Sequence, residues 1–142
     1  MKAVLALIFV AYFPLVSMAS FTQLRCKTIG EEAIVTVQLS RAVDAQNPWV
    51  GFNTIGANLI VKRIGAHNQY STPVTLSPLS QYGDLSMRGD ATQGGVYLQL
   101  YPEIAGGTAT GKYTGQLFVN DLDKREYFDF RSEGNEPGLV CQ

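Results

Sequence analysis

The stretch Ala33–Leu39, with the sequence AIVTVQL, alternates along its whole length between two sets of side chains. One face of the extended chain carries apolar groups, those of Ala33, Val35, Val37 and Leu39. The other face carries Ile34, Thr36 and Gln38. A period of two residues indicates a β-strand with one face in a hydrophobic core. This segment therefore sets the expectation for the rest of the chain.

Similar short segments recur on both sides of it. We expect strands at Phe21–Ile29, Asn58–Ile64, Val74–Leu76, Asp84–Arg88, Val96–Tyr101, Lys112–Val119, Glu126–Arg131 and Leu139–Cys141. Glycine-rich and polar turns separate them, and no long window after residue 20 has the spacing of an amphipathic helix. The pattern predicts an all-β fold: a single antiparallel β-barrel or β-sandwich of about eight short strands.

Prolines and glycines suggest how some of these segments end. The turn 30–32 (GEE) joins the first two strands as a hairpin. Residues 41–56 read as a long loop with a turn or short strand near Trp49 to Phe52. The strand Val74–Leu76 lies between Pro73 and Pro78, which predicts an edge strand because proline donates no hydrogen bond to a ladder. Pro102 is expected to end the strand before it.

The first 19 residues have the organisation of a secretory signal peptide. Lys2 supplies a positive charge, residues 3–16 form an apolar run without charges, and Ser17-Met18-Ala19 places small residues before a cleavage point after Ala19. The apolar run is shorter than the roughly 20 residues of a spanning helix. We therefore predict a cleaved signal, a secreted or periplasmic protein, and a single β-domain over residues 20–142 with no membrane span.

Two cysteines stand near the ends of the predicted mature chain. In an exported protein an even cysteine count indicates a disulfide, and Cys26 and Cys141 allow one intramolecular pairing. A bridge requires their Cα atoms to lie within about 7 Å. The first and last strands should therefore lie side by side or face each other, as the ends of a barrel or sandwich do.

Charge narrows the range of partners. Loss of Lys2 with the signal leaves ten basic and twelve acidic residues, without a long block of either sign. A nucleic-acid-binding protein would show a basic stripe or patch, and a membrane-surface protein a polybasic segment. Neither pattern is present, so we expect neither kind of partner.

Candidate catalytic and metal-binding residues are few. His67 is the only histidine and stands in a polar turn without a Gly-x-Ser-x-Gly nucleophile motif. Asp121-Leu122-Asp123 begins like a calcium loop, but Arg125 occupies the place of a third oxygen ligand. No carboxylate pair can be assigned to a cleft. We therefore predict no cofactor, no metal and no catalytic residue.

One tripeptide matches a known adhesion signal. Arg88-Gly89-Asp90 spells the sequence of integrin-binding loops, and we expect it at a turn where it would be displayed. A three-residue match also occurs by chance. The alternative is a glycine turn flanked by an ordinary ion pair.

Aromatic residues are the remaining candidates for a site. Tyr97, Tyr101 and Tyr127 are expected to face outward, and exposed tyrosines are enriched in protein interfaces. Trp49 and Phe52 lie in the long loop, which makes it a candidate recognition loop. The alternative is that both cap one end of the core.

The sequence therefore favours a binding module for a protein or cell-envelope partner. In outline the layout is similar to small periplasmic lysozyme inhibitors, which are compact β-barrels with terminal disulfides. That likeness is one of architecture, without a motif to transfer, and implies an enzyme inhibitor as one form of the module. The alternatives are a small barrel that holds an apolar ligand and, less favoured, a hydrolase.

Overall fold

The computed structural model of the chain describes residues 20–79, 86–91 and 94–142. The predicted signal peptide, residues 1–19, lies outside the described residues, as do residues 84 and 85 of one predicted strand. Nine strands are present, and the described residues contain no helix. They are β1 (Ser20–Thr28), β2 (Ala33–Asp44), β3 (Ile55–Arg63), β4 (Tyr70–Pro78), β5 (Met87–Asp90), β6 (Val96–Ala105), β7 (Thr108–Asp121), β8 (Glu126–Phe130) and β9 (Leu139–Cys141).

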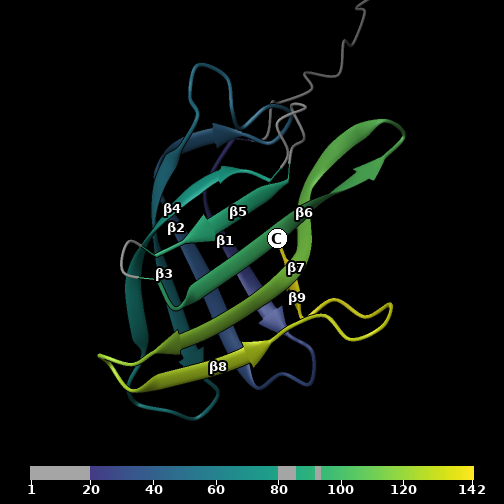
Figure 1. Cartoon of the computed structure of the whole chain (residues 1–142). Coiled ribbons are helices and arrows are strands. Elements are labelled where there is room, and N and C mark those ends of the chain that lie inside the picture. Colours follow the sequence, from purple (N-terminus) through teal and green to yellow (C-terminus); the bar gives the residue numbers. More distant parts are fainter. Residues whose placement is uncertain (1–19, 80–85, 92–93) are drawn as a thin grey trace, which may run out of the picture.

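The strands close into an antiparallel barrel (Figure 1). Strands β1 to β6 follow one another round the wall, β6 pairs with β7, β7 with β9, and β9 returns to β1. Strand β8 is an additional strand that pairs with β7 beyond the end of β9. The predicted all-β class is confirmed, and of the two predicted architectures the chain adopts the barrel.

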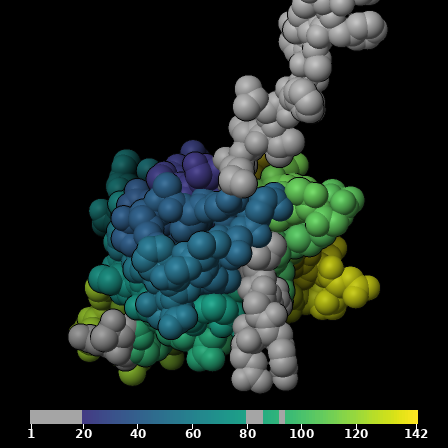
Figure 2. Space-filling model, turned by 90° about the horizontal axis from the view of Figure 1, so that it is seen from above, coloured from purple at the N-terminus to yellow at the C-terminus, as the bar shows by residue number. Residues whose placement is uncertain are grey.

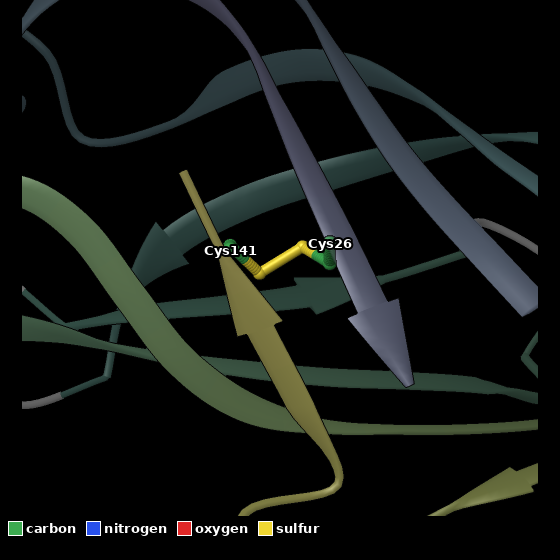
Figure 3. Close-up of a disulfide and its surroundings, with 2 residues drawn as sticks. All are labelled: Cys26 and Cys141. Atoms are coloured by element: carbon green, nitrogen blue, oxygen red, sulfur yellow. A yellow bond between two sulfur atoms is a disulfide. The ribbon is translucent and has the colours of Figure 1, made fainter. Parts of the chain in front are cut away.

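A disulfide completes the closure. Cys26 in β1 and Cys141 in β9 lie directly opposite each other, with Cα atoms 3.9 Å apart and no exposed surface (Figure 3). The predicted pairing of the two cysteines is therefore confirmed. It links the first strand of the barrel to the last across 115 positions of sequence.

The core lies inside the barrel and is made of the inward side chains of every strand. Those without measurable exposure include Val35, Val37, Leu59, Leu76, Met87, Leu98, Leu100, Leu117 and Leu139. The apolar face predicted for Ala33–Leu39 points inward in β2, and alternate residues of β6 and β8 are buried in the same way. The interior is thus occupied by branched and long apolar side chains.

The predicted loop over residues 41–56 is shorter than expected. Strand β2 continues to Asp44 and β3 begins at Ile55, so the connection is residues 45–54. The β1–β2 register shifts between Phe21 and Gln23, where residues 39–42 of β2 stand opposite a single residue of β1, and beyond the shift Phe21 pairs with buried Val43. An irregularity of this kind adds residues to one strand, three in this case, which the alternation of the sequence does not reveal.

The prediction of an edge strand at Val74–Leu76 was wrong. Strand β4 spans Tyr70–Pro78 and pairs with β3 on one side and β5 on the other. In the described ladders Pro73 has a partner only in β3, and Pro78 only in β5. Each proline thus stands where one neighbour is missing, so its absent N–H can face the unpaired side.

The prediction that Pro102 ends its strand was also wrong. Strand β6 continues to Ala105 and forms a long hairpin with β7, with a register shift between Pro102 and Ile104. The described β5–β6 ladder ends at Leu100, so Pro102 has a strand neighbour only in β7. This hairpin extends beyond the barrel wall (Figure 1).

Candidate functional site

The outer surface of β5, β6, β7 and β8 carries a row of aromatic and polar side chains. Cross-strand partners point to the same side of a sheet. One row runs Asp90, Tyr97, Phe118 and Asp129, and the next runs Arg88, Gln99 and Gln116. Tyr101 opposite Thr114, and Asn120 opposite Tyr127, flank these rows. We call this surface the tyrosine face.

The three tyrosines predicted to face outward do so. Their exposed fractions are 36% for Tyr97, 42% for Tyr101 and 55% for Tyr127. The structure adds half-buried Phe118, which the sequence analysis did not single out. The alternation of β7 already placed Phe118 outward, but only the register shows that it joins Tyr97 and lies diagonally across from Tyr127.

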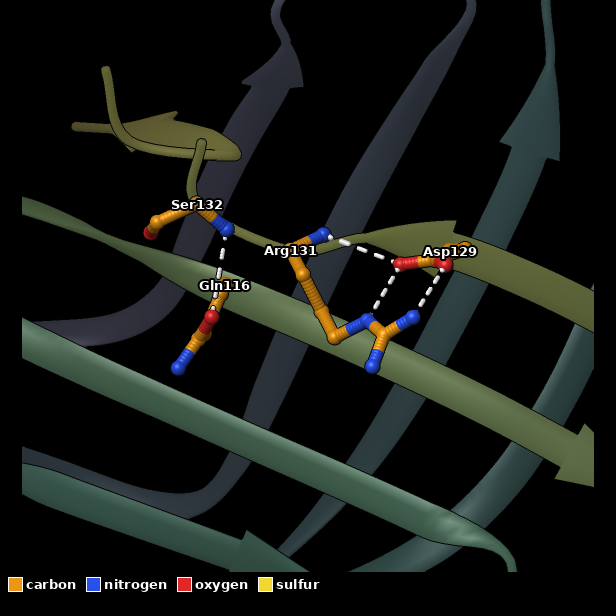
Figure 4. A network of polar contacts seen from close by, with 4 residues as sticks. All are labelled: Gln116, Asp129, Arg131 and Ser132. Carbon is orange, nitrogen blue, oxygen red and sulfur yellow. Dashed lines mark hydrogen bonds and ion pairs between the residues drawn. The ribbon is translucent and has the colours of Figure 1, made fainter. Parts of the chain in front are cut away.

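Neighbouring groups hold the rings of Phe118 and Tyr127 in place. Phe118 and Tyr127 meet edge to face, with centroids 5.6 Å apart. The Arg131 guanidinium lies 5.0 Å from the Phe118 ring centroid and donates two hydrogen bonds to Asp129, of 2.8 and 2.7 Å (Figure 4). Those bonds lower the pKa of the Asp129 carboxyl and raise that of Arg131. Both charges on this part of the face are therefore paired.

Two glutamines connect the strands beneath the tyrosines. Gln116 Nε2 donates to Gln99 Oε1 at 2.7 Å, and the Tyr101 hydroxyl donates to the same oxygen at 3.3 Å. Gln116 Oε1 in turn accepts the Ser132 N–H at 3.1 Å (Figure 4). The polar groups of the face are thus ordered by contacts within the protein.

The adhesion-like tripeptide lies in a strand, so the prediction of a turn at Arg88-Gly89-Asp90 was wrong. All three residues belong to β5. Gly89 points into the barrel, where an added Cβ would meet Leu76 Cδ2 at 3.0 Å and Leu98 Cβ at 3.2 Å. Arg88 and Asp90 bind each other on the outer surface at 2.9 Å. The tripeptide therefore contributes an ion pair to the tyrosine face.

The candidate recognition loop divides its two aromatic residues. Trp49 packs against the core, whereas Phe52 is 52% exposed with the Arg41 guanidinium 3.0 Å from its ring centroid. The Gln46 side chain anchors the loop to β7 by donating to Ala109 O and accepting from Ala109 N. Seen from this end, the segment that contains the loop covers much of the barrel (Figure 2). Trp49 therefore caps the core, and Phe52 does not.

Two of the hollows in the surface of the described residues lie next to β7 and β8. The larger, about 490 Å³, lies between the start of β4, residues 91, 94 and 95 beside β5 and β6, and the β7–β8 turn. The smaller, about 230 Å³, lies beside the end of β8 and contains Glu32, Glu133 and Glu136. Neither is an apolar cavity inside the barrel.

The other chemical candidates are dispersed. His67 is exposed in the β3–β4 turn and has no hydrogen bond to any described residue. Asp121 accepts hydrogen bonds from the Lys124 N–H and, second, from the Tyr70 hydroxyl, and both lower the pKa of its carboxyl. Across the described ranges, no group of three or more His, Cys, Asp or Glu residues has the arrangement of a metal site. Nor is any helix there long and apolar enough to cross a membrane.

Because the comparisons with protein families and with curated proteins found no match, the site is interpreted from its geometry. No protein-family model matches the chain, and no curated protein matches its sequence.

Proposed function

We propose that this protein is a secreted or periplasmic binding module, and that it engages a partner protein through the tyrosine face. The observation that carries the proposal is the gathering of Tyr97, Tyr101, Phe118 and Tyr127 on one wall of a closed barrel. Tyrosine and arginine are enriched among the residues that contribute most to protein interfaces.

The order of the face supports the proposal. Immobilising a flexible side chain on binding costs roughly 0.5–1.5 kcal/mol. Here the aromatic contact of Phe118 with Tyr127, the pairing of Arg131 with Asp129 and the glutamine ladder already restrict those side chains. A partner would therefore bind side chains that are already ordered in the folded protein, so that less conformational entropy is lost on binding.

The buried disulfide supports the proposed compartment. Disulfides persist in oxidising environments such as the periplasm and the extracellular space. The signal-like segment of residues 1–19 agrees with export, and cleavage after Ala19 would leave Ser20, the first residue of β1, as the N-terminus. Intact-mass measurement of the protein recovered from its producing cells tests this directly, because the mature chain should begin at Ser20 and lack two hydrogens.

The alternative of an apolar ligand inside the barrel has less support. Large side chains from all the wall strands occupy the interior, including fully buried Leu24, Leu59, Leu98 and Leu117. Eight-stranded barrels either fill their interior with side chains or hold one small ligand. The packing of these residues favours the filled kind.

Site-specific photocrosslinking tests the proposed interface. A photoreactive phenylalanine analogue at position 101 samples the tyrosine face, and the same analogue at position 38 samples the opposite wall. Exposed to the proteins of its own compartment, the position-101 variant should form a discrete adduct that the position-38 variant does not form. Equal adducts from both positions would contradict the proposal.

The partner identified in this way allows a quantitative test. The Y97A/Y127A variant should bind it at least 30-fold more weakly, the loss of about 2 kcal/mol expected from hot-spot residues. The T36A/Q38A variant, changed on the opposite wall, should bind within twofold of the native protein. Circular dichroism should show all three proteins folded alike, so that a change of binding reports the surface.

A further inference from the structure

The larger hollow adjoins the tyrosine face. Asn120, which pairs with Tyr127 on that face, also lines the hollow. Gly95, on the other side, directly precedes β6, which carries Tyr97. A partner lying across the tyrosine face would therefore reach the hollow with a neighbouring side chain.

The lining combines apolar surface with an available carboxylate. Pro73, Ala91 and Leu122 supply the apolar part, and Asp121 and Asp123 supply two carboxylates. Asp121 is held by the Tyr70 hydroxyl at 2.9 Å and the Lys124 N–H at 3.0 Å. The carboxylate of Asp123 is exposed and makes no hydrogen bond or ion pair with any other described residue.

Lys124, the cation in the lining, has partners of its own. The Lys124 ammonium donates to the Ser71 carbonyl and lies 5.3 Å from the Tyr70 ring centroid. With Asp121, Asp123 and Lys124 counted together, the lining of the hollow keeps one net negative charge. A positively charged occupant complements it.

The geometry points to the side chain of an arginine or lysine of the partner protein as the occupant of this hollow, an inference that rests on the proposed function. Long basic side chains place their aliphatic stems on apolar surface while the charged head stays near water. Here Pro73, Ala91 and Leu122 contact the stem, and Asp123 binds the head. A volume of about 490 Å³ accommodates such a group together with water.

A divalent cation fits the same lining poorly. Calcium takes six to eight oxygen ligands. Both oxygens of Asp121 already accept hydrogen bonds from Lys124 and Tyr70, which leaves Asp123 as the lone carboxylate without a partner. A guanidinium or ammonium group needs only that one carboxylate and nearby carbonyl oxygens.

Nuclear magnetic resonance of the isolated protein tests the pocket without knowledge of the partner. The probes are N-acetyl-arginine amide and its neutral analogue N-acetyl-citrulline amide. The arginine probe should shift the backbone amides of residues 94–95 and 120–124, and the citrulline probe should not. The D123N variant should lose these shifts. E31Q, which removes one charge in the exposed β1–β2 turn, should keep them.

The outcomes separate this inference from the proposed function. The inference that the hollow binds a basic side chain would be overturned by equal shifts from both probes, by unchanged shifts in D123N, or by no shifts at millimolar probe. The photocrosslinking at position 101 is unaffected by any of these results and judges the tyrosine face alone. With the identified protein partner, D123N should weaken binding by about two- to fivefold, the range of exposed ion pairs.

If the adduct formed by photocrosslinking at position 101 proved to be a glycan, the inference of a basic side chain from a partner protein would be overturned. Such an adduct would also redirect the proposed function from proteins to carbohydrates. If D123N bound a protein partner with the native affinity within experimental error, the inference of a basic side chain in the hollow would be overturned. The proposed role of the tyrosine face would not be affected.

Discussion

The two halves of the barrel wall have similar inner faces and different outer faces. The outer surface of β1–β4 also forms cross-strand rows, one of Gln23, Gln38, Asn58 and Pro73 and another of Arg25, Thr36, Ile60 and Ser71. Neither row contains an aromatic side chain. On β5–β8 the corresponding rows contain Tyr97, Phe118 and, alongside them, Tyr101 and Tyr127.

This contrast shows what the barrel itself requires. Both halves bury alternate apolar residues, so the core requires the same pattern of inward side chains from each half. Cross-strand aromatic pairs contribute roughly 0.2–1 kcal/mol each. The half built from β1–β4 folds without them. Stability of the wall therefore does not require the tyrosines, which agrees with the proposed role of this face in binding a partner.

The largest expected effect comes from removing the disulfide that joins β1 of the first half to β9, which pairs with β7 of the second half. The C26A/C141A variant should lose about 4–5 kcal/mol of unfolding free energy, because the bridge closes a loop of more than a hundred residues in the unfolded chain. Urea unfolding followed by tryptophan fluorescence measures the change. A loss below 1 kcal/mol would mean that strand pairing alone holds β1 against β9.

A second test compares one glycine from each half. At Gly115 in β7 an added Cβ would lie 1.9 Å from the Gln99 backbone oxygen, whereas at Gly56 in β3 the nearest atom is Ser40 Oγ at 3.6 Å. Gly115→Ala should therefore destabilise the fold by about 2–3 kcal/mol, as overpacking does. Gly56→Ala serves as the matched control, with a change within about 0.5 kcal/mol. Similar losses from the two variants would contradict the close approach of β6 and β7.

A third test compares the inside and the outside of the aromatic half. Tyr113 on β7 is 1% exposed, and its hydroxyl has no hydrogen-bond partner among the described residues. Tyr113→Phe should stabilise the protein by about 1 kcal/mol at neutral pH, because an unsatisfied buried hydroxyl is removed. Tyr101→Phe, on the outer face, should change stability by less than about 0.5 kcal/mol.

The alkaline behaviour of the same variant gives an independent check. Burial raises the pKa of Tyr113 to about 12, above the value of about 10 for a tyrosine in an unfolded chain. The folded state therefore holds this proton more tightly, and the associated stability declines as the pH rises from about 10 towards 12. Tyr113→Phe should show a shallower decline over that range. An identical decline would contradict the buried position of the hydroxyl.

The smallest effect concerns the hydrogen bond between Tyr70 in one half and Asp121 in the other. Asp121 of β7 has a lowered pKa because it accepts the Lys124 N–H and the hydroxyl of Tyr70 in β4. Its contribution to stability is present above the unfolded pKa of about 3.9 and is lost as the pH falls through the lower folded value. Asp121→Asn should therefore lower stability slightly at pH 7, with the difference from the native protein vanishing in acid. Urea unfolding between pH 2 and 7 measures it, with E31Q as the control.

Local sequence patterns are enough to predict the β class, the inward face of most strands and the pairing of Cys26 with Cys141. These follow from the two-residue period of strand side chains and from the fact that two cysteines permit one intramolecular bridge. The outward direction of Tyr97, Tyr101 and Tyr127 was accessible for the same reason. All of these are properties of single segments or of a simple count.

Which segments meet becomes known only from the folded barrel. The choice of a barrel over a sandwich depends on the pairing of β6 with β7 and of β9 with β1. Neither pairing can be predicted from the sequence of a single strand. The place of Phe118 between Tyr97 and Asp129, the burial of Gly89 inside the barrel and the tolerance of Pro73 within β4 likewise depend on register. Register is a non-local property, because it is set by bulges and by packing between distant strands. A face built from four strands therefore becomes visible only when the barrel has closed.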